Sequence, residues 1–285
     1  MKLIKSFLTT AYFILLIGTA PFLFAQKMQA EDIIAKHLDS IGTSEARAAT
    51  KSQIAVGDAQ IKFISKRTTP IVGRIVIAAA SEKNFWGMNL NSTDYPMEKF
   101  SYDGSKAKVG FSRAGVRSVL GGFVLSNNLM LEEGLLGGTL SHSWAMLNMA
   151  NRKAKISYDG TKKVNGKEGY VLGYSPKGGS DVDIKLYFDK ETFRHIRTEY
   201  KRVSSAGIGL TPDASSRYSE NRITLSEDFS DFKPEGKLTL PHGYRILYST
   251  TGTSSGSTEI EWTFNLTEFA FNQNLAANTF DIEAK

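Results

Sequence analysis

The sequence contains no cysteine among its 285 residues. This absence excludes disulfide scaffolds, thiolate zinc sites, cysteine nucleophiles and lipid attachment through an N-terminal cysteine. Histidine is scarce, with 4 residues in the whole chain. The HExxH and GxSxG motifs, a glycine-rich phosphate loop and calcium-loop spacing are all missing. We therefore expect no catalytic residues, no cofactor and no metal site.

The scattered polar residues suggest only weak alternatives to this interpretation. His142 lies between two serines, but adjacent residues on a helix do not face each other. His195 and His242 are expected on a strand and in a turn, and a metal site built on them would need a carboxylate such as Asp189 or Glu199. A pair of catalytic carboxylates, as in glycosidases, is an alternative that the sequence leaves open, because nothing singles out one pair among 29 acidic residues.

The overall composition is that of a globular protein. Apolar residues make up 41% of the chain and charged residues 22%, which excludes disorder, collagen and coiled coil as descriptions of the whole. The formal net charge of +6 is modest. Nucleic-acid binding usually needs a concentrated basic stripe, and a mild excess of positive charge is no argument for one, so we expect no nucleic-acid partner.

Only one long apolar run occurs, at residues 7–24, directly after two lysines. This layout is typical of a secretory signal peptide, and we expect residues 1–25 to be removed, leaving a single domain at 26–285. A retained membrane anchor is the alternative, because the run is close to spanning length. A proline within the run and the small residue Ala25 after it favour the signal peptide, and with it a periplasmic location.

Residues 30–41 are predicted to form an amphipathic helix. Apolar residues and His37 recur at helical spacing, two acids lie in the first turn, and Gly42 suits the position after the helix. His37 is expected to be a partly covered side chain on the flank of this helix.

Beyond residue 50 the apolar pattern changes to a period of two. The alternation is bounded by turn dipeptides at Asp103-Gly104, Asp159-Gly160 and Asn165-Gly166. We count about ten or eleven strands, which predicts one large antiparallel sheet or barrel. The segments in which apolar residues alternate, of which neighbours can belong to one strand, lie at 75–79, 86–90, 100–102, 109–111, 156–158, 170–174, 184–188, 196–200, 223–225, 244–248, 260–266 and 280–282.

Two stretches interrupt this regular alternation. Residues 203–217 are rich in Ser, Gly, Pro and Ala and are expected to form a flexible loop. Residues 116–150 carry apolar residues at helical spacing and few charges, which predicts a helical insertion between strands. Glycine pairs at 121–122 and 137–138 interrupt it and are candidate hinges.

The insertion is expected to cover the apolar face of the sheet. It contains Met130, Met146 and Met149, and methionine is common on surfaces that accept varied apolar partners. A curved sheet under such a helical lid would form an apolar pocket suited to acyl chains. The alternative is that the same residues fill a dry core without a ligand.

Several segments resemble those of the outer-membrane lipoprotein-sorting carriers, the LolA/LolB superfamily, and in particular its larger, uncharacterised members. The resembling segments are residues 30–38, 158–172, 184–192, 228–242 and 278–282. The resemblance implies an unclosed, strongly curved antiparallel barrel with an N-terminal helix, whose concave apolar side is covered by a helical lid. It also implies that the chain binds the acyl chain of a lipid or lipoprotein and is not an enzyme. The chain departs from the small carriers in its extra residues at 203–217 and 250–258.

We therefore expect a mainly β (α+β) carrier with diffuse apolar contacts. The lid contacts are expected from Phe123 and Trp144, and the floor from Trp86, Phe188 and Trp262. A ligand-free module of the cell envelope with a protein partner is the alternative, and a filled, dry interior would favour it. The complete set of predicted ligand-binding residues is Trp86, Met88, Leu120, Phe123, Leu136, Leu140, Trp144, Phe188, Trp262 and Phe264.

Overall fold

The computed structural model describes residues 28–66, 68–204, 220–252 and 256–283. The expected signal peptide at 1–25 lies outside the described residues, as does the expected loop at 203–217 apart from its first two residues. The description below concerns the described ranges alone.

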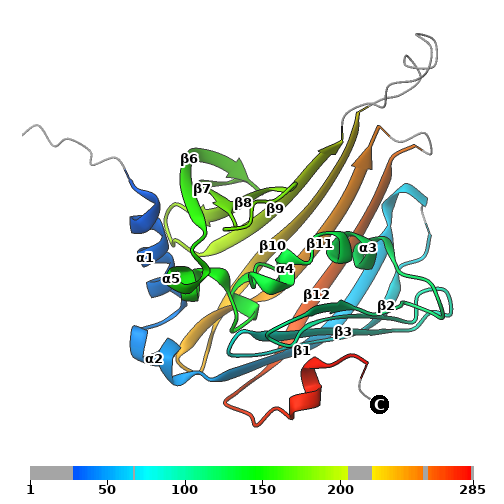
Figure 1. Ribbon diagram of the computed structural model, residues 1–285, viewed down its shortest axis with the longest axis horizontal. Coiled ribbons are helices and arrows are strands. Elements are labelled where there is room, and N and C mark those ends of the chain that lie inside the picture. Colours follow the sequence, from blue (N-terminus) through cyan, green and yellow to red (C-terminus); the bar gives the residue numbers. More distant parts are fainter. Residues whose placement is uncertain (1–27, 67, 205–219, 253–255, 284–285) are drawn as a thin grey trace, which may run out of the picture.

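One antiparallel sheet of 12 strands dominates the structure, in the order β5-β4-β3-β2-β1-β12-β11-β10-β9-β8-β7-β6. Within the described residues β5 and β6 are its two free edges, and Figure 1 shows the sheet curving strongly without closing. The predicted fold class is confirmed. The strands are β1 (Ser52–Phe63), β2 (Ile71–Ala80), β3 (Lys83–Leu90), β4 (Met97–Tyr102), β5 (Ala107–Val109), β6 (Lys155–Val164), β7 (Lys167–Ser175), β8 (Asp183–Asp189), β9 (His195–Ser204), β10 (Asn221–Glu235), β11 (Leu238–Thr251) and β12 (Thr258–Phe271).

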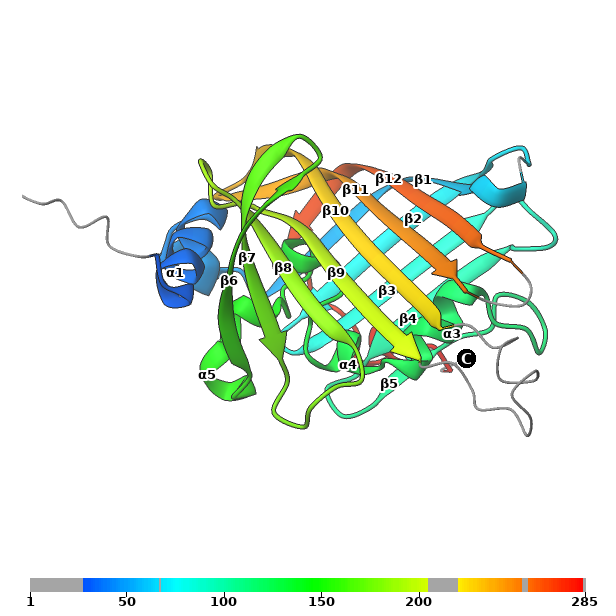
Figure 2. The ribbon, with the colours of Figure 1, turned by 90° about the horizontal axis from the view of Figure 1, so that it is seen from above.

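The centre of the sheet joins distant parts of the chain. β1 pairs with β12 on one side and β2 on the other, so the first and last strands are neighbours. The curvature gives the sheet two wings, and Figure 2 shows β8–β11 crossing in front of β2–β4. Alternate side chains of each strand face the concave side, where aromatic and aliphatic residues from most strands form one hydrophobic core.

Two short helices lie at one end of the half-barrel, α1 (Ala30–Ile41) and α2 (Ser44–Ala49). α1 confirms the predicted N-terminal helix. The Asp32 carboxylate accepts a hydrogen bond from the Gln29 backbone N–H at 3.2 Å, and Ile33 and Ile41 face the core.

The segment between β5 and β6, residues 110–154, is called the insertion below. It contains α3 (Val119–Ser126), α4 (Leu129–Glu132), η2 (Gly138–Leu140), η3 (Ala145–Asn148) and α5 (Met149–Arg152). Figure 1 shows α3 and α4 crossing the concave side of the sheet. A helical insertion was predicted here, although its helices are shorter than its apolar pattern suggested.

Some local predictions were wrong. Asp159-Gly160 is not a turn, because β6 continues through it with a register shift between Tyr158 and Thr161. His242 lies within β11 rather than in a turn. The expected last strand at 280–282 is absent from the described residues, and the chain there forms the 3-10 helix η4 (Ala277–Phe280).

β1 was missed because small residues weaken its alternation. Its inward positions include Ala55 and Ala59, and Gly57 lies so close to β12 that an added Cβ would be 2.1 Å from the Asn265 carbonyl oxygen. The close approach of β12 explains why this position has no side chain.

Candidate functional site

The concave side of the sheet is filled by the insertion. Every predicted ligand-binding residue is buried, and all of them belong to one hydrophobic core. Trp86, Met88, Phe188, Trp262 and Phe264 come from strands, whereas the remaining residues come from the insertion. The structure therefore packs the predicted floor and lid residues together in one hydrophobic core.

An open cavity of about 620 Å³ lies at the end of the half-barrel opposite α1. It is bounded by α3, β12, the 3-10 helix η1 (Ile64–Lys66) and the loop between β3 and β4. Of the predicted residues only Trp262 lines it, so the other lining residues were missed. These are Phe63, Ser65, Lys66, Asp94, Tyr95, Ser112, Arg113, Val116, Arg117, Ser118, Val119, Ser257, Thr258, Glu259 and Ile260.

The wall of this cavity is apolar toward the core and charged at the rim. Val116 and Val119 are 42% and 43% exposed, so both present aliphatic surface to the cavity. At the rim, Arg113 forms an ion pair with Asp94 at 3.3 Å. The Arg117 guanidinium lies 4.1 Å from the centre of the Phe111 ring. The cavity is therefore amphipathic, with cations outside and aliphatic and aromatic groups inside.

The inner end of the cavity has a buried polar cluster. Trp262 Nε1 donates a hydrogen bond to the Tyr95 hydroxyl at 3.1 Å. The Tyr95 hydroxyl and Ser118 Oγ both donate to Glu98 Oε2. Ser118 also accepts from the Gly121 N–H at 2.8 Å and so caps the N-terminus of α3. Burial raises the pKa of Glu98 to about 7, although these two hydrogen bonds lower it.

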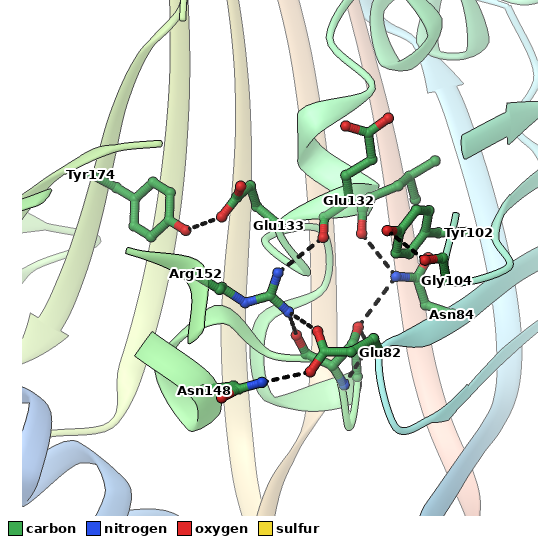
Figure 3. Close-up of polar contacts among 12 residues, drawn as sticks. Glu82, Asn84, Tyr102, Gly104, Glu132, Glu133, Asn148, Arg152 and Tyr174 are labelled. Carbon is green, nitrogen blue, oxygen red and sulfur yellow. Dashed lines mark hydrogen bonds and ion pairs between the residues drawn. The ribbon is translucent and has the colours of Figure 1, made fainter. Parts of the chain in front are cut away.

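A second group of polar contacts ties the other end of the insertion to the sheet (Figure 3). Arg152, whose side chain is 7% exposed, pairs with Glu82 at 2.7 Å. The same guanidinium donates to the carbonyls of Glu132 and Ser143, both at 2.9 Å. On the other wing, the Tyr174 hydroxyl of β7 donates to Glu133 at 2.5 Å. The insertion is thus held from both wings of the sheet.

Trp144 connects the insertion to α1. Its Nε1 donates to His37 Nε2 at 2.9 Å, so His37 carries its proton on Nδ1 and donates to the Phe193 carbonyl at 3.0 Å. His37 is 1% exposed, which corrects the expectation of a partly covered side chain. Burial lowers the pKa of His37 to about 3, so the ring is neutral. The indole of Trp144 also stacks on His195, with ring centres 4.6 Å apart.

A carboxylate that the sequence analysis missed lies beneath the insertion. Glu227 on β10 is 0% exposed and accepts from the Gly137 N–H at 2.7 Å. It also accepts from the hydroxyls of Tyr244 and Tyr200, at 2.6 and 2.9 Å. Burial raises the pKa of Glu227 to about 7, and the hydrogen bonds lower it.

These groups do not form a recognisable catalytic arrangement. Glu98 and Glu227 have no hydrogen-bond partner in common among the described residues, as a converging carboxylate pair would be expected to have. Ser141 and Ser143 bond to each other at 2.7 Å through their hydroxyls, with His142 between them in sequence. In the described ranges no group of three or more His, Cys, Asp and Glu side chains could hold a metal ion.

Comparison with known proteins gives similar folds at low sequence identity. Neither a protein-family model nor a curated protein sequence matches the chain. A LolA superfamily protein from Nitrosomonas europaea is similar in structure, with a TM-score of 0.46, 10% identity, and coverage of 89% of this chain and 97% of that chain. A putative outer membrane lipoprotein-sorting protein domain from Vibrio parahaemolyticus gives a TM-score of 0.42 and 14% identity, covering 87% and 97%.

At these identities and TM-scores the similarity concerns the overall fold alone. No helix in the described residues is long and apolar enough to cross a membrane.

Proposed function

We propose that this protein is a non-catalytic periplasmic carrier that binds the acyl chain of a lipid or lipoprotein. The observation that carries the proposal is the open cavity of about 620 Å³, because its inner wall is continuous with the hydrophobic core through Trp262. Pockets for small ligands typically have volumes of roughly 300–1,000 Å³ and apolar walls with a few polar groups. This cavity has that size, and Phe63, Val116, Val119, Ile260 and Trp262 give it an apolar part, although most of its lining residues are polar or charged.

Binding would rest on burial of apolar surface. Each methylene group that leaves water contributes about 0.8 kcal/mol, so a chain of several methylenes gains enough affinity without covalent chemistry. Val116, Val119 and Ile260 offer the aliphatic wall, and the cations at the rim suit a polar or anionic head group that stays near solvent.

A longer chain would have to displace part of the insertion. The concave side beyond Trp262 is filled, so the core residues of the insertion become ligand contacts only after the insertion moves. The polar contacts of Arg152 and Glu98 hold the insertion at definite points, and such contacts can be exchanged for water as it lifts. The glycine pairs at 121–122 and 137–138 stay our candidate hinges.

A matched pair of variants on α3 tests the cavity. Val119 lines the cavity, whereas Leu125 is similarly exposed, at 45%, but is not a lining residue. Val119→Asp places a charge in the apolar wall and is expected to weaken binding of a fluorescent fatty-acyl probe at least about tenfold. Leu125→Asp is expected to leave the affinity unchanged. Equal affinities of the two variants would contradict the assignment of this cavity.

A ligand-free envelope module with a protein partner is the second candidate. The filled concave side favours it, because the predicted site residues pack against each other in one core. Native mass spectrometry of protein purified from a periplasm, followed by organic extraction, distinguishes the two functions. A bound lipid supports the carrier, and a clean apo mass with no uptake of an acyl probe supports the module.

A further inference from the structure

The buried carboxylate of Glu227 lies at the point where the insertion touches the floor of the half-barrel. Its Oε1 accepts from the Gly137 N–H at 2.7 Å and from the Tyr244 hydroxyl at 2.6 Å. Its Oε2 accepts from the Tyr200 hydroxyl at 2.9 Å. Both tyrosines and the glutamate belong to the sheet, so only the Gly137 N–H would leave if the insertion lifted.

The glycine pair of the insertion brings its backbone very close to the floor. A Cβ at Gly137 would lie 2.1 Å from Cζ2 of Trp86, and a Cβ at Gly138 would lie 2.6 Å from Nδ1 of His195. Both glycines have positive φ, 78° and 50°, so a side chain there would also be strained. The bare peptide of the insertion therefore occupies a narrow position against polar floor groups.

This peptide does not satisfy all of those groups. Trp86 Nε1 and His195 Nδ1 are buried, and neither has a hydrogen-bond partner in the described part of the chain. A buried polar atom without a partner is unfavourable and rare in folded proteins. The floor around Gly137 thus offers one acceptor that the insertion uses, at Glu227, and one donor that it leaves unused, at Trp86.

Glu227 lies close to the cavity in the register of the sheet. Trp262 of β12 pairs with Ile246 of β11, and Ile246 pairs with Glu227 of β10. Trp262 and Glu227 are therefore two strand spacings apart, a distance of about 10 Å. Because Trp262 lines the cavity, a ligand that extends from the cavity under the insertion reaches Glu227 within a short distance.

Resting on the carrier function proposed above, we infer that Glu227 accepts a hydrogen bond from the N–H of an amide-linked acyl chain. In the closed structure the Gly137 peptide holds this position. A ligand amide has the same N–H, and its carbonyl oxygen can accept from the Trp86 indole that now lacks a partner. An ester has no N–H, and the carboxylate of a free fatty acid has no N–H either. The site therefore selects N-acyl compounds.

Three fluorescent probes of equal chain length test this selection on the unmodified protein. One is a secondary amide, the second is its N-methyl derivative, and the third is the matching ester. One hydrogen bond corresponds to up to about tenfold in affinity, so the secondary amide is expected to bind about tenfold more tightly than both others. Equal binding of the three probes would overturn the inference and leave the carrier function standing. Binding of none of them would overturn the carrier function, and this inference with it.

Variants of the protein assign the preference to Glu227. Glu227→Met removes the acceptor and is expected to abolish the preference for the amide. Glu227→Gln keeps a carbonyl oxygen and is expected to retain most of it, and Tyr200→Phe, which removes only the donor to Oε2, serves as the matched control. A preference that persists in Glu227→Met would overturn the inference. If that variant does not fold, the comparison of the secondary amide with its N-methyl derivative on the unmodified protein still decides whether the site binds an N–H.

Discussion

Replacement of Glu98 by glutamine is expected to remove a distinct part of the pH dependence of folding. Glu98 is 1% exposed, and burial raises its pKa from 4.5 to about 7, while the hydrogen bonds from Ser118 and Tyr95 lower it. Glutamine has nearly the same shape, and its carbonyl oxygen can accept the same hydrogen bonds. The substitution therefore removes the titration of Glu98 and disturbs little else.

The sign and size of the effect follow from the shift in pKa. A folded-state pKa above the unfolded value means that the contribution of Glu98 to stability is fully present below pH 4.5 and is lost as the pH rises through about 7. Each pKa unit corresponds to about 1.4 kcal/mol, and the loss between about pH 5 and pH 8 comes to roughly 2.5 kcal/mol.

Other buried groups titrate in the same range, so the stability of the wild type alone is not diagnostic. The pKa of Glu227 is also raised to about 7, and its contribution has the same sign. The pKa of His37 is lowered from 6.5 to about 3, so its contribution is present above pH 6.5 and is lost as the pH falls toward 3. The two kinds of group oppose each other near pH 5 to 6. The difference between wild type and variant isolates Glu98.

Urea unfolding of wild type and Glu98→Gln at several pH values measures this difference. The variant is expected to gain about 2.5 kcal/mol relative to wild type between about pH 5 and pH 8. Glu191→Gln is a matched control, because Glu191 is exposed and the substitution should leave the pH dependence unchanged. A difference between Glu98→Gln and wild type that stays constant with pH would refute the reasoning.

Three further substitutions test how the insertion is held. Arg152→Met leaves two carbonyls of the insertion without their donor and is expected to lower the free energy of unfolding by about 2–4 kcal/mol. Amide hydrogen exchange in residues 110–154 should become faster, and unchanged exchange there would contradict the prediction. Gly137→Ala introduces a clash with the β3 indole at a positive φ and is expected to lower stability by at least about 2 kcal/mol, whereas Gly122→Ala, with open space at its Cβ, is expected to be neutral or stabilising in thermal melts. Trp144→Phe leaves His37 Nε2 unsatisfied and is expected to cost about 1–3 kcal/mol; a melting temperature equal to wild type would exclude that contribution.

The sequence predicted the architecture because the sheet depends on local alternation. Apolar residues at every second position, with the turns at Asp103-Gly104 and Asn165-Gly166, identified most strands and two hairpins, and the loss of that period identified the insertion. β1 was not predicted because small residues occupy its inward positions. The cavity could not be predicted, because its lining comes from segments that meet only after β1 pairs with β12. The predicted site residues were recognised as apolar, but an apolar pattern does not distinguish a ligand contact from a core contact.

The inward positions of the two buried carboxylates, in contrast, could be predicted from the alternation of residues along their strands. Glu98 precedes Phe100 by two residues, and Glu227 lies between Leu225 and Phe229 at the same spacing, so alternation places both carboxylates on the inward face. Burial of a carboxylate on the inward face of a strand is costly in free energy unless the carboxylate accepts hydrogen bonds. Both accept such bonds, and each accepts from a group of the insertion, Ser118 in one case and Gly137 in the other, as well as from tyrosine hydroxyls outside it. Satisfied polar contacts of this kind fix the position of a cover more closely than apolar packing alone. In the proposed carrier, the N–H of a ligand would take over the contact with Glu227 that Gly137 makes in this structure.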